Sequence, residues 1–160
     1  MEIEGSARAL LSGERTALNI VGRMAGIATG VAEAQSISSE ASSSVKVAAT
    51  RKTLPGLRAL DKKAVSLGGG DTHRLRLDDC VLIKDNHLEL VPSITDAVKK
   101  AKAHVSFTKK IEVEVRNLVE AEEAAEAGAD IIMFDNMSPG EICICLDALK
   151  ERGLHGGRLF

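Results

Sequence analysis

The chain has 160 residues, of which 44% are hydrophobic and 28% are charged, and its formal net charge is −2. This composition is typical of an ordinary folded domain and argues against disorder over most of the chain. Aromatic residues make up only 2%, with no Trp and no Tyr, so the stacking surfaces that nucleic-acid bases need are missing and we expect no nucleic-acid role.

Neither a membrane span nor a secretion signal is visible. No apolar run approaches the roughly 18 residues of a spanning helix. The start, Met1–Glu4, lacks the basic and then apolar order of a signal peptide. We therefore expect a cytoplasmic protein with no membrane contact.

The first predicted element is one long helix. From about Ser12 to Ala34, apolar residues recur at helical spacing. Gly22, Gly26 and Gly30 fall four residues apart on it, which favours close packing of this face against a neighbouring element. The serine-rich stretch from Ser36 to Ser44 has the composition of a turn or linker. Residues 1–44 are thus expected to comprise a long helix and a linker.

Residues 45–150 then alternate between short β-rich runs and segments of helical character. The predicted strands are Val45–Ala49, Val81–Lys84, Lys110–Val115 and Asp130–Phe134. A shorter helix is expected over Gly56–Leu67, with a glycine stop at residues 68–70. The best-marked helix starts are Ser93, Asn117 and Ser138, each with an acidic residue three positions later and the last with Pro139 after it.

This alternation predicts an α/β fold with parallel strands and right-handed crossovers, either an open doubly wound sheet or a (β/α) barrel. Both architectures place ligands at the carboxyl ends of strands. Residues 151–160 are expected to form an irregular tail.

Cationic residues gather at the ends of the predicted strands in an acidic chain. Arg51 and Lys52 follow the first strand and Lys84 ends the second, while His73 and Arg74 lie on the loop before the second strand. A basic pair such as Arg51 and Lys52 is by itself most often a solvated surface pair. Repetition at successive strand ends instead favours a site for a small polyanion, because Arg pairs with carboxylate or phosphate oxygens and Lys adds a movable charge. The glycines at 68–70 are expected to let the backbone approach such a ligand.

Carboxylates reach the same predicted rim from Glu114 and Asp135. Alternation along the strand sends Glu112 and Glu114 to one face. Such carboxylates suit hydroxyls, Mg²⁺ or a developing positive charge. The alternative is a pair of acids on a solvated edge strand. Cys80, Cys143 and Cys145 are interpreted as reduced thiols without a shared metal.

Five blocks of this sequence, together with Glu14–Asn19 on the long helix, resemble the signature blocks of quinolinate phosphoribosyltransferases. The blocks are Thr50–Arg58, Gly68–Arg74, Leu82–His87, Ile111–Val115 and Ala127–Met137. The resemblance covers nearly the whole chain in one order. It implies an incomplete (β/α) barrel, because the family's amino-terminal sandwich domain and the last barrel strands, with their Ser-Gly-Gly phosphate block, have no counterpart here.

The resemblance implies a reaction in which quinolinate and phosphoribosyl pyrophosphate give nicotinate mononucleotide, pyrophosphate and CO₂, with Mg²⁺. It assigns quinolinate binding to the residues matching Arg51, Lys52, His73, Arg74 and Lys84, with Thr50 beside them. It places Glu114 and Asp135 at the ribose hydroxyls and at the metal, directly or through water. Catalytic roles fall to Lys52, Lys84, Glu114 and Asp135.

The resemblance also implies a homodimer, in which the residue matching Arg15 enters the neighbouring subunit's pocket. Because the phosphate block is missing, we expect a fragment, a truncated gene product or a split subunit that is inactive alone, and the unpaired strand edges of an open half-barrel would favour association. Two alternatives stay open at this point. One is a non-catalytic truncated homologue that serves as an association module, and the other is a related enzyme acting on a different anion.

Overall fold

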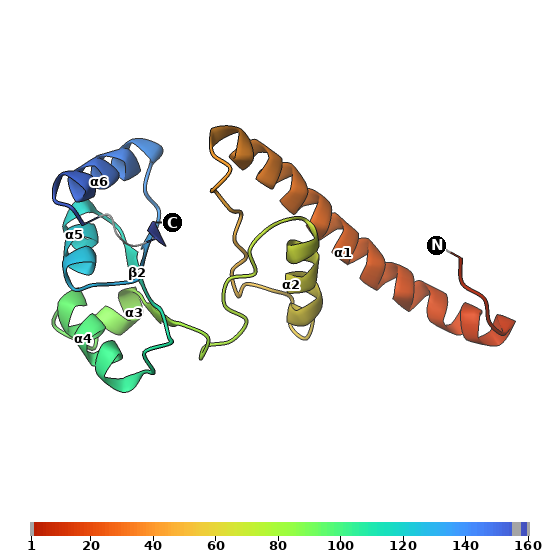
Figure 1. Cartoon of the computed structure of the whole chain (residues 1–160). Coiled ribbons are helices and arrows are strands. Elements are labelled where there is room, and N and C mark those ends of the chain that lie inside the picture. Colours follow the sequence, from red (N-terminus) through yellow and green to blue (C-terminus); the bar gives the residue numbers. More distant parts are fainter. Residues whose placement is uncertain (1, 155–157, 160) are drawn as a thin grey trace. The chain divides into compact units, whose positions relative to one another are not determined.

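The computed structural model describes residues 2–154 and 158–159 of the chain. It divides into two compact units, Met1–Arg76 (unit 1) and Leu77–Phe160 (unit 2), and both are drawn in Figure 1. No helix among the described residues combines the length and the apolar character needed to cross a membrane.

Unit 1 contains two helices, α1 (Ala7–Ala41) and α2 (Arg58–Leu67), which lie side by side in Figure 1. The predicted long helix is confirmed, and with 35 residues it extends beyond both predicted ends. Its start is fixed by Ser6, whose side chain accepts a hydrogen bond from the Ala9 amide. None of the residues of α1 is buried.

The predicted turn over residues 36–44 is wrong for its first six residues, which continue α1. The Ser38 hydroxyl donates to the Ala34 carbonyl at 2.9 Å, and the Ser39 hydroxyl donates to the Gln35 carbonyl at 2.7 Å. By bonding one turn back, these serines remain compatible with a helix. Only residues 42–44 leave it.

The strand predicted at Val45–Ala49 does not form. Its one backbone pairing is an isolated parallel bridge between Ala48 and Asp71. The Gln35 side chain takes up backbone groups that a neighbouring strand would otherwise pair: its amide donates to the Val45 carbonyl at 2.8 Å, and its oxygen accepts the Val47 amide at 2.9 Å. The segment is therefore extended but held mainly by side chains.

Two of the glycines after α2 serve helix packing. A Cβ atom at Gly68 would lie 2.5 Å from the Ala28 carbonyl oxygen of α1, and one at Gly70 would lie 2.8 Å from Val31. These two glycines therefore allow close approach to α1, while the expected approach of this run to a ligand stays a prediction. Conversely, the expected packing of Gly22, Gly26 and Gly30 is not seen, since a Cβ at any of them meets nothing within 4 Å among the described residues.

Unit 2 alternates strands and helices as predicted. Its elements are β1 (Val81–Ile83), α3 (Asp85–Leu88), α4 (Ile94–His104), β2 (Ile111–Val115), α5 (Leu118–Glu126), β3 (Ile131–Phe134), α6 (Pro139–Glu151) and β4 (Arg158–Leu159). All pairings are parallel, in the order β1-β2-β3-β4. The α/β class, the parallel sheet and the three predicted strands of this unit are confirmed, while closure into a barrel stays a prediction.

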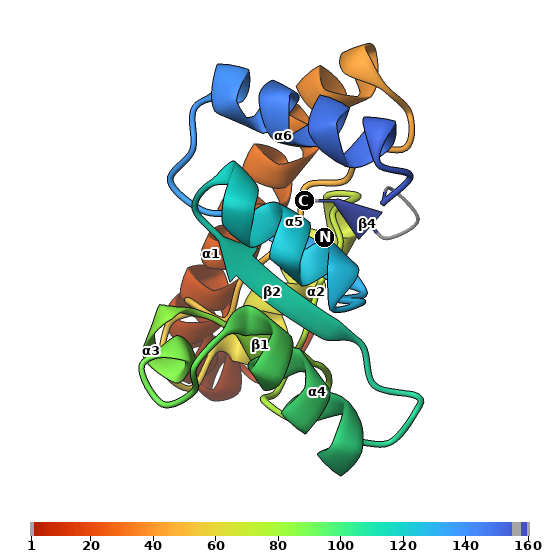
Figure 2. The same ribbon diagram turned by 90° about the vertical axis from the view of Figure 1, so that its left-hand side faces the viewer.

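The helix starts predicted at Ser93, Asn117 and Ser138 are all confirmed, because each side chain accepts a hydrogen bond from the amide three residues later. The core lies between β2 and the helices α4 and α5, which flank it in Figure 2. Val113 and Val115 of β2 are fully buried there, and the carboxyl ends of β1, β2 and β3 are aligned. The predicted irregular tail falls partly on residues 155–157 and 160, which lie outside the described residues.

Candidate functional site

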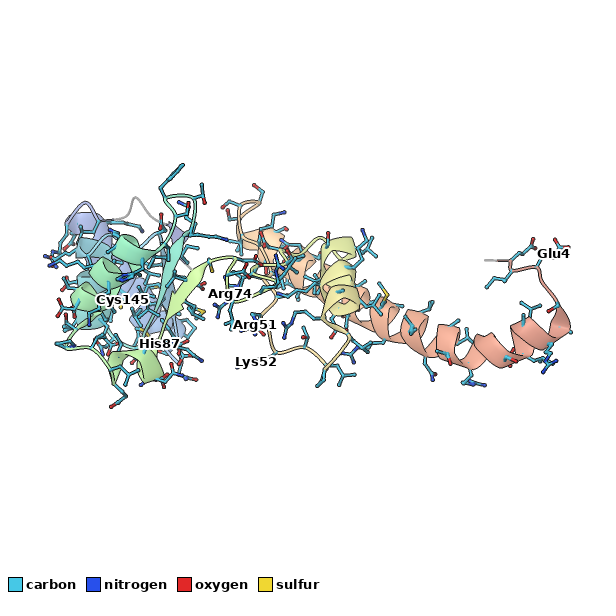
Figure 3. The ribbon with its side chains drawn as sticks, turned by 90° about the horizontal axis from the view of Figure 1, so that it is seen from below. Glu4, Arg51, Lys52, Arg74, His87 and Cys145 are labelled. Carbon is cyan, nitrogen blue, oxygen red and sulfur yellow. The ribbon has the colours of Figure 1, made fainter. Side chains whose placement is uncertain are left out.

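Unit 1 brings two predicted cationic segments together. The backbone of residues 47–49 hydrogen-bonds to Asp71 in both directions, over 2.8 and 2.9 Å, in a parallel bridge. Because the two stretches run parallel, the residues that follow each of them leave at the same end. Figure 3 accordingly shows Arg51, Lys52 and Arg74 on neighbouring stretches of the ribbon.

Beneath these segments lies Lys62 of α2, which the sequence reasoning missed. Its side chain is 2% exposed. The ammonium donates to the Ala49 carbonyl at 2.8 Å and also to the Thr72 carbonyl. Burial lowers the pKa of Lys62, and the positive charges of Arg58, Arg51 and Arg74 lower it further. Unit 1 therefore holds a crowded cationic cluster, which we call the unit 1 cation cluster: Arg51, Arg58, Lys62 and Arg74.

The hydrogen-bonding groups of the unit 1 cation cluster are suited to binding an anion. The Nε atom of Arg51 is buried and has no hydrogen-bond partner among the described residues. A buried, unsatisfied guanidinium N–H calls for an acceptor, and a carboxylate or phosphate oxygen supplies one. His73 adopts a positive φ of 48°, and its amide donates to the Asp71 carboxylate at 2.6 Å. Thr50 and Lys52 are exposed, and the Thr50 hydroxyl accepts the Lys52 amide at 3.1 Å.

An ion pair fixes the loop that carries Arg51 and Lys52. Arg23 of α1 donates to both carboxylate oxygens of Asp61 at 2.7 and 2.8 Å, and Asp61 also accepts the Leu54 amide at 3.3 Å. The hydrogen bond from Arg23 holds the pKa of Asp61 below its usual range, against the effect of burial. One carboxylate thus links α1, α2 and this loop.

Arg15 is not part of the unit 1 cation cluster. It lies on the exposed amino-terminal half of α1, and no hydrogen bond or ion pair joins its side chain to another described residue. The structure therefore leaves its predicted role in a neighbouring subunit as a prediction.

Unit 2 brings Lys84, Glu114 and Asp135 together at the carboxyl ends of its strands. Lys84 directly follows β1, Glu114 lies in β2, and Asp135 follows β3, with its amide donating to the Val115 carbonyl at 2.9 Å. Burial raises the pKa of Glu114, and the neighbouring Asp135 carboxylate raises it further, whereas the charge of Lys84 lowers it. These three side chains form one group, as the sequence predicted.

Neighbouring side chains orient this group. Arg116, which follows β2, donates to the Asp85 carboxylate at 2.6 Å and so ties the end of β2 to that of β1. The Asn136 amide donates to an oxygen of Asp135 at 2.8 Å. His87 caps the turn after β1, since its Nδ1 accepts the Lys84 amide at 3.2 Å.

Glu112 lies away from this group, deeper in the sheet. It is 2% exposed, and Cys80 donates to it at 3.8 Å. Cys80, Cys143 and Cys145 are all free thiols, as predicted, with Cys143 exposed and Cys145 buried.

The two groups offer complementary chemistry. The unit 1 cation cluster can neutralise a small dianion or trianion. The Glu114 and Asp135 pair offers oxygen ligands of the kind that Mg²⁺ prefers, and a divalent cation would relieve the crowding of negative charge that raises the pKa of Glu114. Each group is observed within its own unit, and their convergence on one mouth stays a prediction.

Four functional neighbours were missed: Arg23, Asp61, Lys62 and Arg116. A signal existed for two of them. Asp61 stands four residues from Leu57 and three from Ala64, and Lys62 stands three from Val65, so both lie on the apolar face of the predicted helix. A charge on such a face needs a buried partner. No comparable signal in the sequence pointed to Arg116.

Comparison with known proteins gives a consistent result. A family model described as quinolinate phosphoribosyl transferase, C-terminal domain, matches residues 27–156. The chain is 51% identical over 154 residues to a probable nicotinate-nucleotide pyrophosphorylase (carboxylating) of Methanothermobacter thermautotrophicus, covering 96% of this chain and 55% of the relative. It is 43% identical over 151 residues to the human nicotinate-nucleotide pyrophosphorylase (carboxylating), covering 94% of this chain and 51% of the relative.

A solved structure agrees with these relatives. The crystal structure of NadC from Streptococcus pyogenes has a TM-score of 0.85 with this chain at 43% identity, covering 97% of this chain and 52% of that one. The chain thus spans about half the length of the proteins that it matches.

Proposed function

This chain belongs to the quinolinate phosphoribosyltransferase family, and from that membership we propose that it supplies part of an enzyme that transfers phosphoribose to quinolinate. The proposed reaction joins quinolinate to phosphoribosyl pyrophosphate and releases nicotinate mononucleotide, pyrophosphate and CO₂, a step of NAD biosynthesis. The observation that carries the proposal is the unit 1 cation cluster, which includes the unsatisfied Nε of Arg51.

In this proposal cationic residues hold the two carboxylates of quinolinate. They are Arg51, Lys52, His73, Arg74 and Lys84, with Thr50 beside them. A dianion needs several positive groups, because each carboxylate loses its hydration on entering the site. Paired hydrogen bonds from Arg to a carboxylate fix the orientation of the ring. Lys adds a positive charge that does not require one fixed hydrogen-bond geometry.

Glu114 and Asp135 are proposed to face the ribose and to hold Mg²⁺, directly or through water. Mg²⁺ would neutralise the pyrophosphate that leaves. As pyrophosphate departs, the ribose carbon becomes cation-like, and the two carboxylates stabilise it. The ring nitrogen supplies its own electron pair, so this step needs no strong general base.

Decarboxylation follows from the charge that the first step creates. Once ribosylated, the ring nitrogen is cationic. Loss of the adjacent carboxylate as CO₂ leaves a carbanion that this nitrogen stabilises, and the carbanion takes up a proton from solvent to give the product. Lys52 and Lys84 are proposed to assist decarboxylation by placing positive charge near the carbanion. The proposed active form is a homodimer in which Arg15 reaches the neighbouring subunit's site. The 160-residue chain, which spans half the length of its relatives, is expected to bind quinolinate without turnover.

Calorimetric titration with quinolinate tests this proposal. Saturable binding is expected for the chain, and Arg74→Ala is expected to abolish it, while Arg8→Ala, at the exposed start of α1, serves as the matched control. No binding to a well-folded chain would instead favour a non-catalytic association module. Steady formation of nicotinate mononucleotide by the 160-residue chain would contradict the expected lack of turnover.

A further inference from the structure

Lys62 occupies the point where the two anion-binding segments of unit 1 meet. Backbone pairing between the segments ends at Ala49 and Asp71. The Lys62 ammonium takes the next two carbonyls, those of Ala49 and Thr72. The ammonium therefore extends the link between the two segments by one residue beyond the backbone pairing. The residues that carry the cationic side chains follow directly.

Burying this ammonium is energetically costly. A lysine that is 2% exposed loses almost all of its hydration, and three arginines of the unit 1 cation cluster repel it. Among the charged groups that act on it, only Asp71 favours the charged form, while Arg51, Arg58 and Arg74 oppose it. An apolar side chain would fill the same space without this penalty, but it would leave two partly buried carbonyls without this partner.

We propose that Lys62 is a positioning residue of the anion site, whose ammonium sets the spacing between Arg51 on one segment and His73 and Arg74 on the other. The inference rests on the proposed function for the identity of the anion, quinolinate. Lys62 itself acts through the backbone and makes no contact with the ligand.

A protonation consequence follows from the same geometry. An anion bound to Arg51 and Arg74 offsets the positive charge that opposes protonation of Lys62. Quinolinate binding is therefore linked to proton uptake at pH values where Lys62 is partly neutral, and this linkage disappears when the amine is removed.

The test compares Lys62→Met with Lys63→Met, a matched control at the exposed neighbouring position. Hydrogen exchange at the amides of Ala49 and Asp71 is expected to quicken at least about tenfold in Lys62→Met, since the pairing loses its continuation. Quinolinate affinity is expected to fall by at least about tenfold in calorimetry, the loss that follows when a site is misaligned. Lys63→Met is expected to change neither quantity.

A further readout separates positioning by a charged amine from simple packing. Titrations in two buffers of different ionisation enthalpy, between about pH 7 and 10, are expected to show proton uptake for the wild type that is smaller or absent in Lys62→Met. If Lys62→Met does not fold, Lys62→Arg, which keeps the charge, is expected to retain exchange protection at Ala49 and Asp71.

Unchanged exchange at Ala49 and Asp71 in folded Lys62→Met would overturn the inference, as would loss of that protection in Lys62→Arg. So would equal proton uptake by the wild type and Lys62→Met. If the wild type fails to bind quinolinate, the proposed function fails instead, and the exchange measurement still decides whether Lys62 holds the two segments.

Discussion

The ion pair between Arg23 and Asp61 is expected to be the main polar link between α1 and the rest of unit 1. We expect Asp61→Asn to destabilise the chain because it removes the charge from a carboxylate that accepts three hydrogen bonds. The carboxylate is 7% exposed, while the guanidinium is 36% exposed. Solvent screening at Arg23 therefore reduces the strength of the pair.

Hydrogen bonds to charged groups contribute about 1.5–3 kcal/mol each when well shielded. With the partial exposure of Arg23, the expected loss for Asp61→Asn is about 2–3 kcal/mol. For a chain of this length that corresponds to a fall in Tm of about 5–10 °C. The coupling between the two side chains is expected to be about 1–2 kcal/mol.

A double-mutant cycle with Arg23→Met, Asp61→Asn and the pair, followed by thermal unfolding in circular dichroism, measures this coupling. Glu33→Gln, on an exposed part of α1, is the control and is expected to shift Tm little. If the double mutant lost the sum of the two single losses, to within about 0.3 kcal/mol, the pair would be uncoupled and the reasoning wrong.

The same pair predicts a pH dependence. The Arg23 guanidinium holds the pKa of Asp61 below its usual range. The resulting stabilisation is present above the unfolded pKa of about 3.9 and is lost as the pH falls through the lower folded pKa. Asp61→Asn is expected to remove that part of the acid sensitivity.

Three further predictions concern glycine packing, the acidic pair and a helix cap. Gly68→Ala is expected to destabilise the chain by about 1–3 kcal/mol, because its Cβ would meet the α1 backbone. Gly26→Ala, with open space around it, should instead stabilise the chain by up to about 1 kcal/mol. Urea unfolding compares the two variants. Asp135→Asn is expected to lower the pKa of Glu114 by removing its like-charged neighbour. Carbon-detected NMR titration of the Glu114 carboxyl measures this pKa. An unchanged or higher pKa would contradict the repulsion between the two carboxylates. Ser138→Ala, which removes the hydroxyl bonds with Glu141 at the start of α6, should cost about 0.5–2 kcal/mol. Ser43→Ala, at an exposed turn position, is its control in the same unfolding assay.

Unit 2 was predictable from sequence because its signals are local. Ser93, Asn117 and Ser138 cap their own helices, and the β-branched runs between them pair in sequence order. The grouping of Lys84, Glu114 and Asp135 followed directly, since parallel strands end at one edge.

Unit 1 was harder to predict because distant side chains decide its backbone. The run at Val45–Ala49 has strand composition, yet Gln35 and Lys62 take up its amide and carbonyl groups. The serines of residues 36–41 have turn composition, yet they bond back along α1. The first outcome cannot be read from local propensity, because Gln35 and Lys62 lie 10 to 13 residues from the groups they bind. The second cannot be read from composition, because serine side chains can bond to the backbone in a turn or in a helix.

Two residues other than glycine have positive φ in the described part of the chain, His73 at 48° and Asn136 at 53°. Each stands at or beside a candidate site residue, and such backbone strain concentrates at functional positions. In that conformation Asn136 restrains the Asp135 carboxylate through a 2.8 Å hydrogen bond. Folding has thus already restricted the rotation of this side chain, so a ligand arriving at Asp135 is spared up to about 1 kcal/mol of ordering entropy.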